Sequence, residues 1–244
     1  AYIYGLPYEY YEKYAVRRYG FHGTSHKYVS LRAAEILGKK PEDLKIVVCH
    51  LGNGSSISAV DGGKCVDTSM GLTPLEGLMM GTRSGAIDPS ILEYVSKESG
   101  ESLEDLTNDL NKKSGLLGIS GYSDSRDVEA ARAAGDKNAT LALDMYNDRI
   151  AKYIAEYYIK LDGEVDALVF TAGVGENGIE ARKEIIRRLN ALGIKVDEEK
   201  NSKIASYKNE NEGIISSDDS SVPVYVLPTN EEIMIIKDTY NLVK

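Results

Sequence analysis

The chain has 244 residues, of which 42% are hydrophobic and 27% are charged, and its formal net charge at pH 7 is -9. These proportions are typical of a globular protein and exclude collagen-like, disordered and membrane-spanning classes. No segment concentrates lysine or arginine, so we expect no nucleic-acid partner. No apolar run approaches the roughly 18 residues that cross a bilayer, and no segment is typical of a signal peptide. We therefore expect a cytoplasmic protein without a membrane partner.

The tyrosines are unevenly distributed along the chain. There are 17 tyrosines against two phenylalanines and no tryptophan, and seven of the tyrosines fall within residues 1–19. The chain begins at Ala1, without an initiator methionine, inside this aromatic pattern. We expect the chain to be a piece of a longer protein.

The first part of the chain predicts one helix and a three-stranded antiparallel meander. Thr24 or Ser25 can cap a helix that Gly38 is placed to end. Apolar, β-branched runs and glycine-containing turns predict three strands, over residues 45–50, 55–60 and 64–68. Cys49 and Cys65 lie in two of these strands and belong to no metal-binding spacing, so we expect reduced core thiols.

A glycine- and methionine-rich segment, residues 72–87, separates the meander from a run of helices. A loop of this length is usually functional or disordered. Asp88 is expected to cap a helix whose first residue is Pro89, and Ser102 with Asp105 resembles a capping box for the next helix. The remaining helical segments are a short one that ends near Gly135, after the polar loop 120–126, and the longest one, at about residues 138–161.

The last part of the chain alternates strands and helices. The expected order is a strand at 165–170, a glycine-rich turn at 171–178, a helix at 179–192, a strand at 222–227 and a final helix with 229–232 as its capping box. Residues 210–221 are polar, and we expect an exposed loop there. This order predicts an α/β fold with a mixed sheet and helices packed on it.

Glycine-rich turns directly after buried strands are the recurring feature of the sequence. Backbone N–H groups at such a turn have no Cβ in front of them, so phosphate oxygens can approach closely. Residues 50–56 form one such turn and residues 173–177 another, and neither continues into the Gly-Lys-Ser/Thr of a P-loop. The second turn opens a GxGxxG pattern, but a lone match of this kind is more often a tight strand-to-helix turn. The preceding meander also argues against a dinucleotide-binding fold.

Three kinds of polar side chain, histidine, arginine and glutamate, are candidates for chemistry. His22 and His26 have the spacing of a metal pair on one helix, but Gly-Thr-Ser between them favours a helix start, where His22 can face an anion together with backbone donors. Arg83 lies between glycines, and a solvated or salt-bridged arginine competes there with a two-pronged clamp on a phosphoryl group. Glu231 and Glu232 suit the first turn of a helix as partners of its dipole. One of these two carboxylates can also hold Mg²⁺ through water.

In this order the motifs resemble those of the acetate kinase (acetokinase) family, within the actin, sugar-kinase and Hsp70 superfamily of nucleotide-binding folds. The motifs that carry the resemblance are residues 18–26, 50–56, 67–85, 170–177 and 228–232. The resemblance runs the whole length of the chain, which covers only the later and larger part of such an enzyme. It implies an α/β, actin/sugar-kinase/Hsp70-like (ribonuclease H-like) domain with a mixed sheet flanked by helices.

The resemblance also assigns a reaction and individual roles. It implies reversible phosphoryl transfer from ATP to acetate, giving acetyl phosphate and ADP, with Mg²⁺ or Mn²⁺ as cofactor. The transition-state stabilisers fall on His22 and Arg83, and the metal ligand falls on Glu231. The phosphate-binding loop falls on His50, Leu51, Gly52, Asn53 and Gly54. The segments that contact adenosine fall on Asp124, Ser125, Arg126, Gly173, Val174, Gly175, Glu176 and Asn177.

Finally, the resemblance implies a division of the chain. Residues 1–20 look like the lead-in from an N-terminal domain, residues 21–228 like the nucleotide-binding C-terminal domain, and residues 229–244 like a terminal helix with the metal-ligand motif. Because the tyrosine-rich residues 2–19 resemble the family's lead-in stretch, we expect their rings to pack at a domain or subunit boundary. The family's N-terminal domain, which supplies the arginine for the carboxylate substrate, has no counterpart here, so we expect the chain alone to be inactive or nearly so. We also expect a homodimer formed through this domain.

Two alternatives stay open: a non-catalytic nucleotide-binding module, and a kinase for propionate or butyrate. One departure from the family pattern is Ala86, where relatives often carry Asp or Asn. We expect the smaller, apolar side chain to loosen the loop that aims Arg83.

Overall fold

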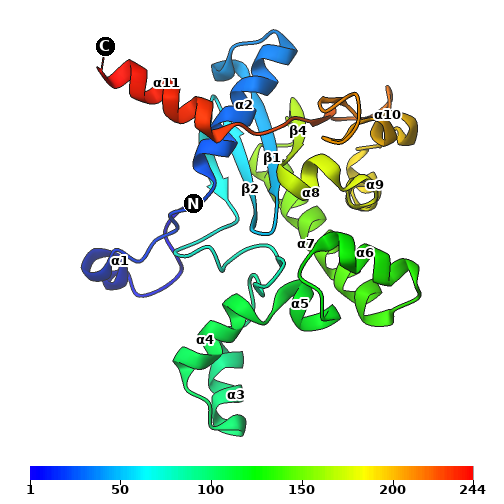
Figure 1. The fold of residues 1–244 in the computed structure, drawn as a ribbon. Helices are drawn as coiled ribbons and strands as arrows, with labels where there is room; N and C mark the ends of the chain where they lie inside the picture. Colours follow the sequence, from blue (N-terminus) through cyan, green and yellow to red (C-terminus); the bar gives the residue numbers. More distant parts are fainter. Residues whose placement is uncertain (244) are drawn as a thin grey trace.

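The computed structural model describes residues 1–243, and its centre is one six-stranded mixed sheet (Figure 1). β1 (Lys45–Leu51) pairs antiparallel with β2 (Ser55–Asp61), which pairs antiparallel with β3 (Lys64–Thr68). On its other side, β1 pairs in parallel with β4 (Ala167–Thr171), and β4 pairs in parallel with β6 (Val224–Val226). The strand order is β3-β2-β1-β4-β6-β5, with β5 at Gly213–Ile214. The predicted meander and the mixed sheet are confirmed.

The two faces of the sheet bury alternate residues of β1 against different helices. Ile46 and Val48 belong to a core cluster with α2 (Gly23–Leu37). Val47 and Cys49 belong to a second, larger cluster with α7 (Lys137–Lys160). Successive side chains of a strand point to opposite faces, so residues 46–49 of β1 are all apolar because both faces are covered.

The other helices surround this sheet and extend beyond it (Figure 1). They are α1 (Glu9–Tyr14), α3 (Ser90–Ser99), α4 (Leu103–Lys112), α5 (Gly115–Ser120), α6 (Ser125–Ala133), α8 (Ala172–Asn177), α9 (Ile179–Arg188), α10 (Glu198–Lys203) and α11 (Glu231–Val243), with short 3₁₀ turns η1 (Pro41–Asp43) and η2 (Asn190–Leu192). α3 and α4 form a hairpin that extends away from the sheet, and α11 packs on α2. Within residues 1–243, no helix combines the length and the apolar character that a bilayer crossing requires.

The long segment 72–87 has neither helix nor strand, as predicted, but part of it is deeply buried. Leu78, Met79 and Met80 belong to the buried core. The backbone of Ala86 donates to Gly77 O at 3.0 Å, so the loop around Arg83 is held by its own hydrogen bonds. This segment is therefore a packed loop that presents Arg83 from the core.

The predicted capping of α2 by Thr24 or Ser25 is wrong. The residue at the N-cap is His22, whose backbone has φ 58° in the left-handed region. The Ser25 hydroxyl instead lies 2.8 Å from His50 Nδ1 and 2.7 Å from Thr229 Oγ1. Polar groups of the buried site therefore compete successfully with the helix end for this side chain.

The other helix starts agree with the sequence more closely. Ser102 Oγ accepts from the Asp105 backbone and donates to its carboxylate, which confirms the capping box. Asp88 accepts from the backbone of Ser90 at 2.9 Å, and α3 begins at that residue, one later than predicted. At α11 the capping side chain is Asn230, which accepts from the Ile233 backbone at 3.1 Å, because Thr229 is engaged with Ser25.

Four further expectations need correction. The segment 171–178 is mostly the short helix α8 and not an open turn. The helix expected over 179–192 is divided into α9 and η2, and the polar segment 210–221 contains β5 and the buried Ile215. Cys65 is exposed because β3 is the edge strand of the sheet, and only Cys49 is a core thiol.

The tyrosine-rich first segment lies on the surface of the described chain. α1 has no buried residue, and Tyr8, Tyr14 and Tyr19 are exposed. Tyr4 is held more firmly, because its hydroxyl bonds Glu76 and accepts from the Leu72 backbone. The packing of these rings at a boundary, and the division into residues 1–20, 21–228 and 229–244, remain predictions.

Candidate active site

A glycine turn, residues 52–54, connects β1 to β2 at the carboxyl end of β1, next to the ends of the parallel strands β4 and β6. Ligands of α/β sheets bind at this edge of parallel strands. Gly52 N donates to Gly54 O at 3.1 Å, and Gly81 N donates to Asn53 O at 3.2 Å. A Cβ on Gly81 would lie 2.0 Å from Asn53 Oδ1, so only glycine allows the Arg83 loop to approach this turn so closely.

His22 lies directly beside the turn. Its ring stacks on the His50 ring with centroids 4.0 Å apart, and its Nδ1 lies 2.9 Å from Ser56 Oγ. The opposite ring edge faces Gly54: Nε2 and Cε1 lie 3.8 Å from the position that a Cβ of Gly54 would take. Left-handed backbone is uncommon for a residue other than glycine, and such strain concentrates at functional sites.

Arg83 approaches the same turn from the long loop. Its Nη1 lies 3.2 Å from the position of a Cβ on Gly54, and it contacts Pro74 O at 3.4 Å. The side chain is half-buried, and no carboxylate within residues 1–243 pairs with it. Salt-bridging therefore does not explain this arginine within the described chain. The structure brings His22 and Arg83 together at Gly54, and their role as transition-state stabilisers stays a prediction.

The ring of His22 is surrounded by charges of both signs. Burial lowers its pKa most, the Glu231 carboxylate opposes that shift, and the Arg83 guanidinium lowers the pKa further. Burial, together with the neighbouring His22, lowers the pKa of His50 to about 3. Both stacked rings are therefore neutral at pH 7.

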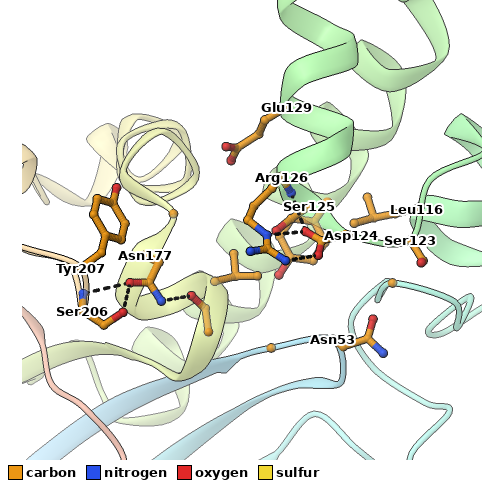
Figure 2. A pocket seen from close by; sticks show the side chains of 16 residues that line it. Asn53, Leu116, Ser123, Asp124, Ser125, Arg126, Glu129, Asn177, Ser206 and Tyr207 are labelled. Atoms are coloured by element: carbon orange, nitrogen blue, oxygen red, sulfur yellow. Dashed lines mark hydrogen bonds and ion pairs between the residues drawn. The ribbon is translucent and has the colours of Figure 1, made fainter.

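A cavity of about 720 Å³ opens beside the glycine turn (Figure 2). Side chains of α6 line one side, Asn177, Ser206 and Tyr207 line the other, and Asn53 lies at the base. The predicted nucleotide-binding residues that line the cavity are Gly52, Asn53, Asp124, Ser125, Arg126, Gly173, Val174 and Asn177. A cavity of this size suits a nucleotide.

The other predicted binding residues do not line the cavity. His50 and Gly54 belong to the histidine and arginine cluster, and Leu51 is in the core. Gly175 is buried, where a Cβ would lie 3.3 Å from the carbonyl carbon of Phe170. Glu176 Oε1 accepts from Ala172 N at 2.9 Å and from Thr229 N at 3.3 Å, so this carboxylate joins β4, α8 and the start of α11.

On the α6 side, Asp124 and Arg126 form a paired unit (Figure 2). Asp124 caps α6 by accepting from Arg126 N at 2.9 Å, and the guanidinium of Arg126 bonds the same carboxylate at 3.0 and 2.6 Å. These bonds lower the pKa of Asp124 to about 2. The carboxylate is therefore ionised at any physiological pH and available to hydroxyl donors.

On the opposite side, Asn177 holds the loop that carries Tyr207. Its Oδ1 accepts from Ser206 N at 2.9 Å and Ser206 Oγ at 2.6 Å, and its amide donates to Gly173 O at 3.0 Å. Arg182, fully buried in α9, donates to the carbonyls of Gly175 and Glu176 at 2.9 and 2.7 Å. These bonds stabilise the end of α8 as the cavity wall.

Several lining residues were not predicted from the sequence. They are Gly81, Leu116, Ser123, Glu129, Tyr146, Gly178, Ser206 and Tyr207. The hydroxyl of Tyr146 is buried and has no hydrogen-bond partner of good geometry within residues 1–243. Ser55 lies close enough to lower its pKa slightly, but burial dominates and raises the pKa to about 12. An orphaned buried hydroxyl in a cavity wall is satisfied by a ligand or by water, so Tyr146 supports a polar occupant.

No group of three or more His, Cys, Asp or Glu residues within the described chain suits a metal. The alternative of a zinc pair at His22 and His26 does not fit, because both rings bond Ser56. Mg²⁺ is commonly held by one or two carboxylates, water and substrate phosphates. Glu231 fits that donor set: it is exposed, its charge acts on His22, and no cation within residues 1–243 pairs with it.

The predicted fold class is confirmed: the protein is an α/β protein whose mixed sheet, flanked by helices, has the fold of solved acetate and propionate kinases. An acetate kinase from Porphyromonas gingivalis superposes with a TM-score of 0.94 at 46% identity, over 100% of this chain and 60% of that one. A propionate kinase from Francisella tularensis superposes with a TM-score of 0.89 at 51% identity, over 95% of this chain and 58% of that one.

The family model for the acetokinase family matches residues 1–237, and the chain belongs to that family. Acetate kinases from Carboxydothermus hydrogenoformans and Thermotoga maritima are 58% and 57% identical to it over 243 and 246 residues, which is 100% of this chain. The chain spans about 60% of the length of these relatives.

Proposed function

We propose that the chain is the C-terminal, nucleotide-binding part of an acetate kinase. The reaction would be reversible phosphoryl transfer from ATP to acetate, giving acetyl phosphate and ADP. The observation that carries the proposal is the convergence of His22 and Arg83 on Gly54, beside a cavity of about 720 Å³. The relatives named acetate kinase support the same reaction.

The reaction demands little acid–base chemistry from the protein. A carboxylate is already an anionic nucleophile, so charge repulsion and positioning set the barrier. Arg83 spreads charge from the transferring phosphoryl group, His22 donates a hydrogen bond to it, and backbone N–H groups of the 52–54 turn hold the phosphates. Each preorganised donor of this kind is worth about 3 kcal/mol in comparable sites.

The cavity would hold the nucleoside. The Asp124 carboxylate is the acceptor for ribose hydroxyls, and Ser125 lies next to it at the start of α6. Arg126 and Tyr207 on the two sides offer a guanidinium and an aromatic ring to the faces of the base (Figure 2). Gly175 and Glu176 would not contact the nucleoside. Gly175 would contribute through packing, and Glu176 through the hydrogen bonds that join α8 to the start of α11.

Mg²⁺ or Mn²⁺ would be held by Glu231, water and the nucleotide phosphates. The ion would neutralise part of the charge on those phosphates. Glu231 itself stands at the first turn of α11, and Glu176 fixes that helix start through its bond to Thr229 N. The carboxylate is thereby positioned relative to His22.

We further propose a homodimer and a cytoplasmic location. The α3–α4 hairpin supports the dimer, because α3 has no buried residue and exposes Ile91 and Tyr94. Exposed apolar groups of this kind favour association. The location follows from the substrates, since ATP and ADP are cytoplasmic nucleotides.

A kinase for propionate is the second candidate, and one observation favours it. The propionate kinase from Francisella tularensis is 51% identical to this chain, a value close to those of the acetate kinases. We propose that the residues that determine the acyl-substrate preference belong to the part of the protein outside this chain. Comparing acetate, propionate and butyrate as substrates separates these candidates.

Two assays test the proposal on the chain itself. In a thermal-shift titration, ADP with Mg²⁺ should raise the melting temperature, because a ligand that binds only the folded state stabilises it. No shift at millimolar nucleotide would exclude a nucleotide site.

In a hydroxamate assay for acetyl phosphate, the chain alone should give little or no product, which is also the behaviour of a non-catalytic module. Turnover near that of a complete relative would contradict the inactivity of the fragment.

A further inference from the structure

A line of four hydrogen-bonding side chains leads from the interior of the sheet to the reacting edge of His22. Ser58 Oγ lies 2.9 Å from His26 Nδ1, and His26 Nε2 lies 2.7 Å from Ser56 Oγ. Ser56 Oγ in turn lies 2.9 Å from His22 Nδ1. Ser56, Ser58 and His26 are all buried, so water does not compete for these bonds.

Only two arrangements of the hydrogens in this line give the Ser56 hydrogen an acceptor. A serine hydroxyl has one hydrogen to donate, and a neutral imidazole donates from one nitrogen and accepts at the other. Ser56 Oγ could also accept from both rings, but its own hydrogen would then have no acceptor within residues 1–243, in a site with no exposure. With that hydrogen paired, Ser56 donates either to His22 or to His26 and accepts from the other ring. Its choice fixes the tautomer of both histidines.

In the inward direction, Ser56 donates to His26 Nε2, and His26 must then donate from Nδ1 to Ser58. The hydrogen of the Ser58 hydroxyl is left without an acceptor within residues 1–243, in a site with no exposure. A buried donor without an acceptor is destabilising, because its lost hydrogen bond to water is not replaced. The inward direction also leaves the hydrogen of His22 on Nδ1.

In the outward direction every donor inside the line has an acceptor. Ser58 donates to His26 Nδ1, His26 Nε2 donates to Ser56, and Ser56 donates to His22 Nδ1. The remaining hydrogen is on His22 Nε2, which faces Gly54 and the Arg83 guanidinium.

We propose that Ser58, His26 and Ser56 are positioning residues that hold the His22 imidazole in the tautomer with its hydrogen on Nε2. The histidine can then donate a hydrogen bond toward the glycine turn while it is neutral. The effect of this tautomer on phosphoryl transfer rests on the proposed function, but the assignment of the tautomer itself does not.

The surroundings of the two rings agree with a line of neutral groups. Burial, with the neighbouring His50 and His22, lowers the pKa of His26 to about 3. The charged groups that act on His22 are Glu231, which opposes burial, and Arg83, which reinforces it. With His22 neutral at pH 7, only the tautomer decides whether its outer nitrogen donates or accepts.

Imidazole nuclear magnetic resonance tests this directly. The chain has three histidines, so two-bond proton–nitrogen correlation spectra of the labelled protein at neutral pH contain three ring systems. We expect both His22 and His26 to show a protonated Nε2 and an unprotonated Nδ1. A hydrogen on Nδ1 of either ring would overturn the proposal.

Two variants separate the line from general packing. Ser56→Ala should shift the His22 nitrogen signals toward the average of the two tautomers, because Nδ1 loses its donor. Ser30→Ala, which removes a buried hydroxyl that donates to Lys27 O on α2, should leave them unchanged. Unchanged His22 signals in folded Ser56→Ala would contradict the proposal. An ADP titration of the wild-type chain reports separately on the proposed function, so the two can fail independently.

Discussion

The imidazole rings of His22 and His50 stack with their planes 18° apart and their centroids 4.0 Å apart. Two positive charges at this separation repel strongly, so the two rings are not charged together, and burial lowers the pKa of each ring, which leaves both neutral at pH 7. The charged side chains that act on His22 are therefore Arg83 and Glu231, while the His22 ring itself is neutral.

The buried histidines make the folded chain sensitive to acid. The pKa of His26 and of His50 is about 3 in the folded state, against about 6.5 for an unperturbed histidine. Between these values the unfolded chain binds more protons, so the free energy of unfolding falls as the pH falls below about 6.5. By about pH 4 the loss for a fully buried histidine is about 3 kcal/mol.

Urea unfolding at a series of pH values, together with the proton resonances of the three rings, measures this loss. We expect His26 and His50 to stay neutral to well below pH 5. Ordinary titration near pH 6.5 for His26 would show that its burial in solution differs from that in the structure.

Replacing Arg83 should remove catalysis while leaving nucleotide binding nearly intact. In a full-length protein that carries this part, we expect Arg83→Ala to lower kcat by about 100- to 1000-fold, with little change in the KM for ATP. Arg187→Ala is the matched control, because that arginine lies on the surface of α9 and pairs with Glu184. An unchanged kcat in Arg83→Ala would remove this residue from the chemistry.

Asp124 should contribute to affinity for the nucleotide. Loss of a charge-assisted hydrogen bond to the ribose is worth about 1.5–3 kcal/mol, so Asp124→Ala should weaken ADP binding by at least 10-fold in titration calorimetry. Asp197→Ala removes a comparable helix cap, the one on Lys200 N at the start of α10, and should leave ADP affinity unchanged. Equal affinities for the two variants would exclude Asp124 from the site.

Gly81 should be intolerant of any side chain. A Cβ there would lie 2.0 Å from Asn53 Oδ1 and 2.9 Å from Ser123 O, so Gly81→Ala must push the Arg83 loop away from the glycine turn. Overpacking of this kind costs about 1–3 kcal/mol, and we expect both thermal stability and ADP affinity to fall. Gly5→Ala is the control, since nothing lies within 4 Å of that Cβ position. Wild-type behaviour of Gly81→Ala would show that the two loops are further apart in solution.

The strands and long helices could be read from the sequence, because their patterns are local. The continuous apolar run of β1 and the glycine that ends α2 each depend on a few neighbouring residues. The caps were predicted less well where a tertiary contact competed. Ser25 bonds His50 and Thr229 across the sheet, and no local pattern contains those partners.

For the same reason, the sequence predicted only part of the candidate site. The resemblance picked out His22 and Arg83, which the structure brings together at Gly54. It also picked out Glu176 and Gly175, whose motif adjoins the cavity. The Glu176 carboxylate bonds the backbone of Ala172, and Gly175 packs against the backbone of Phe170, so neither residue lines the cavity. Tyr146 was missed because it lies in the helical stripe of α7 and looked like core, whereas its ring also lines the cavity.

The hydroxamate assay on a full-length protein that carries this chain tests the central claim most directly. We predict acetyl hydroxamate formation that depends on ATP, acetate and Mg²⁺ and that is lost when His22 and Arg83 are both replaced by alanine. A full-length protein that binds ADP but forms no acyl hydroxamate from acetate, propionate or butyrate would contradict the claim that this is the nucleotide side of a carboxylate kinase.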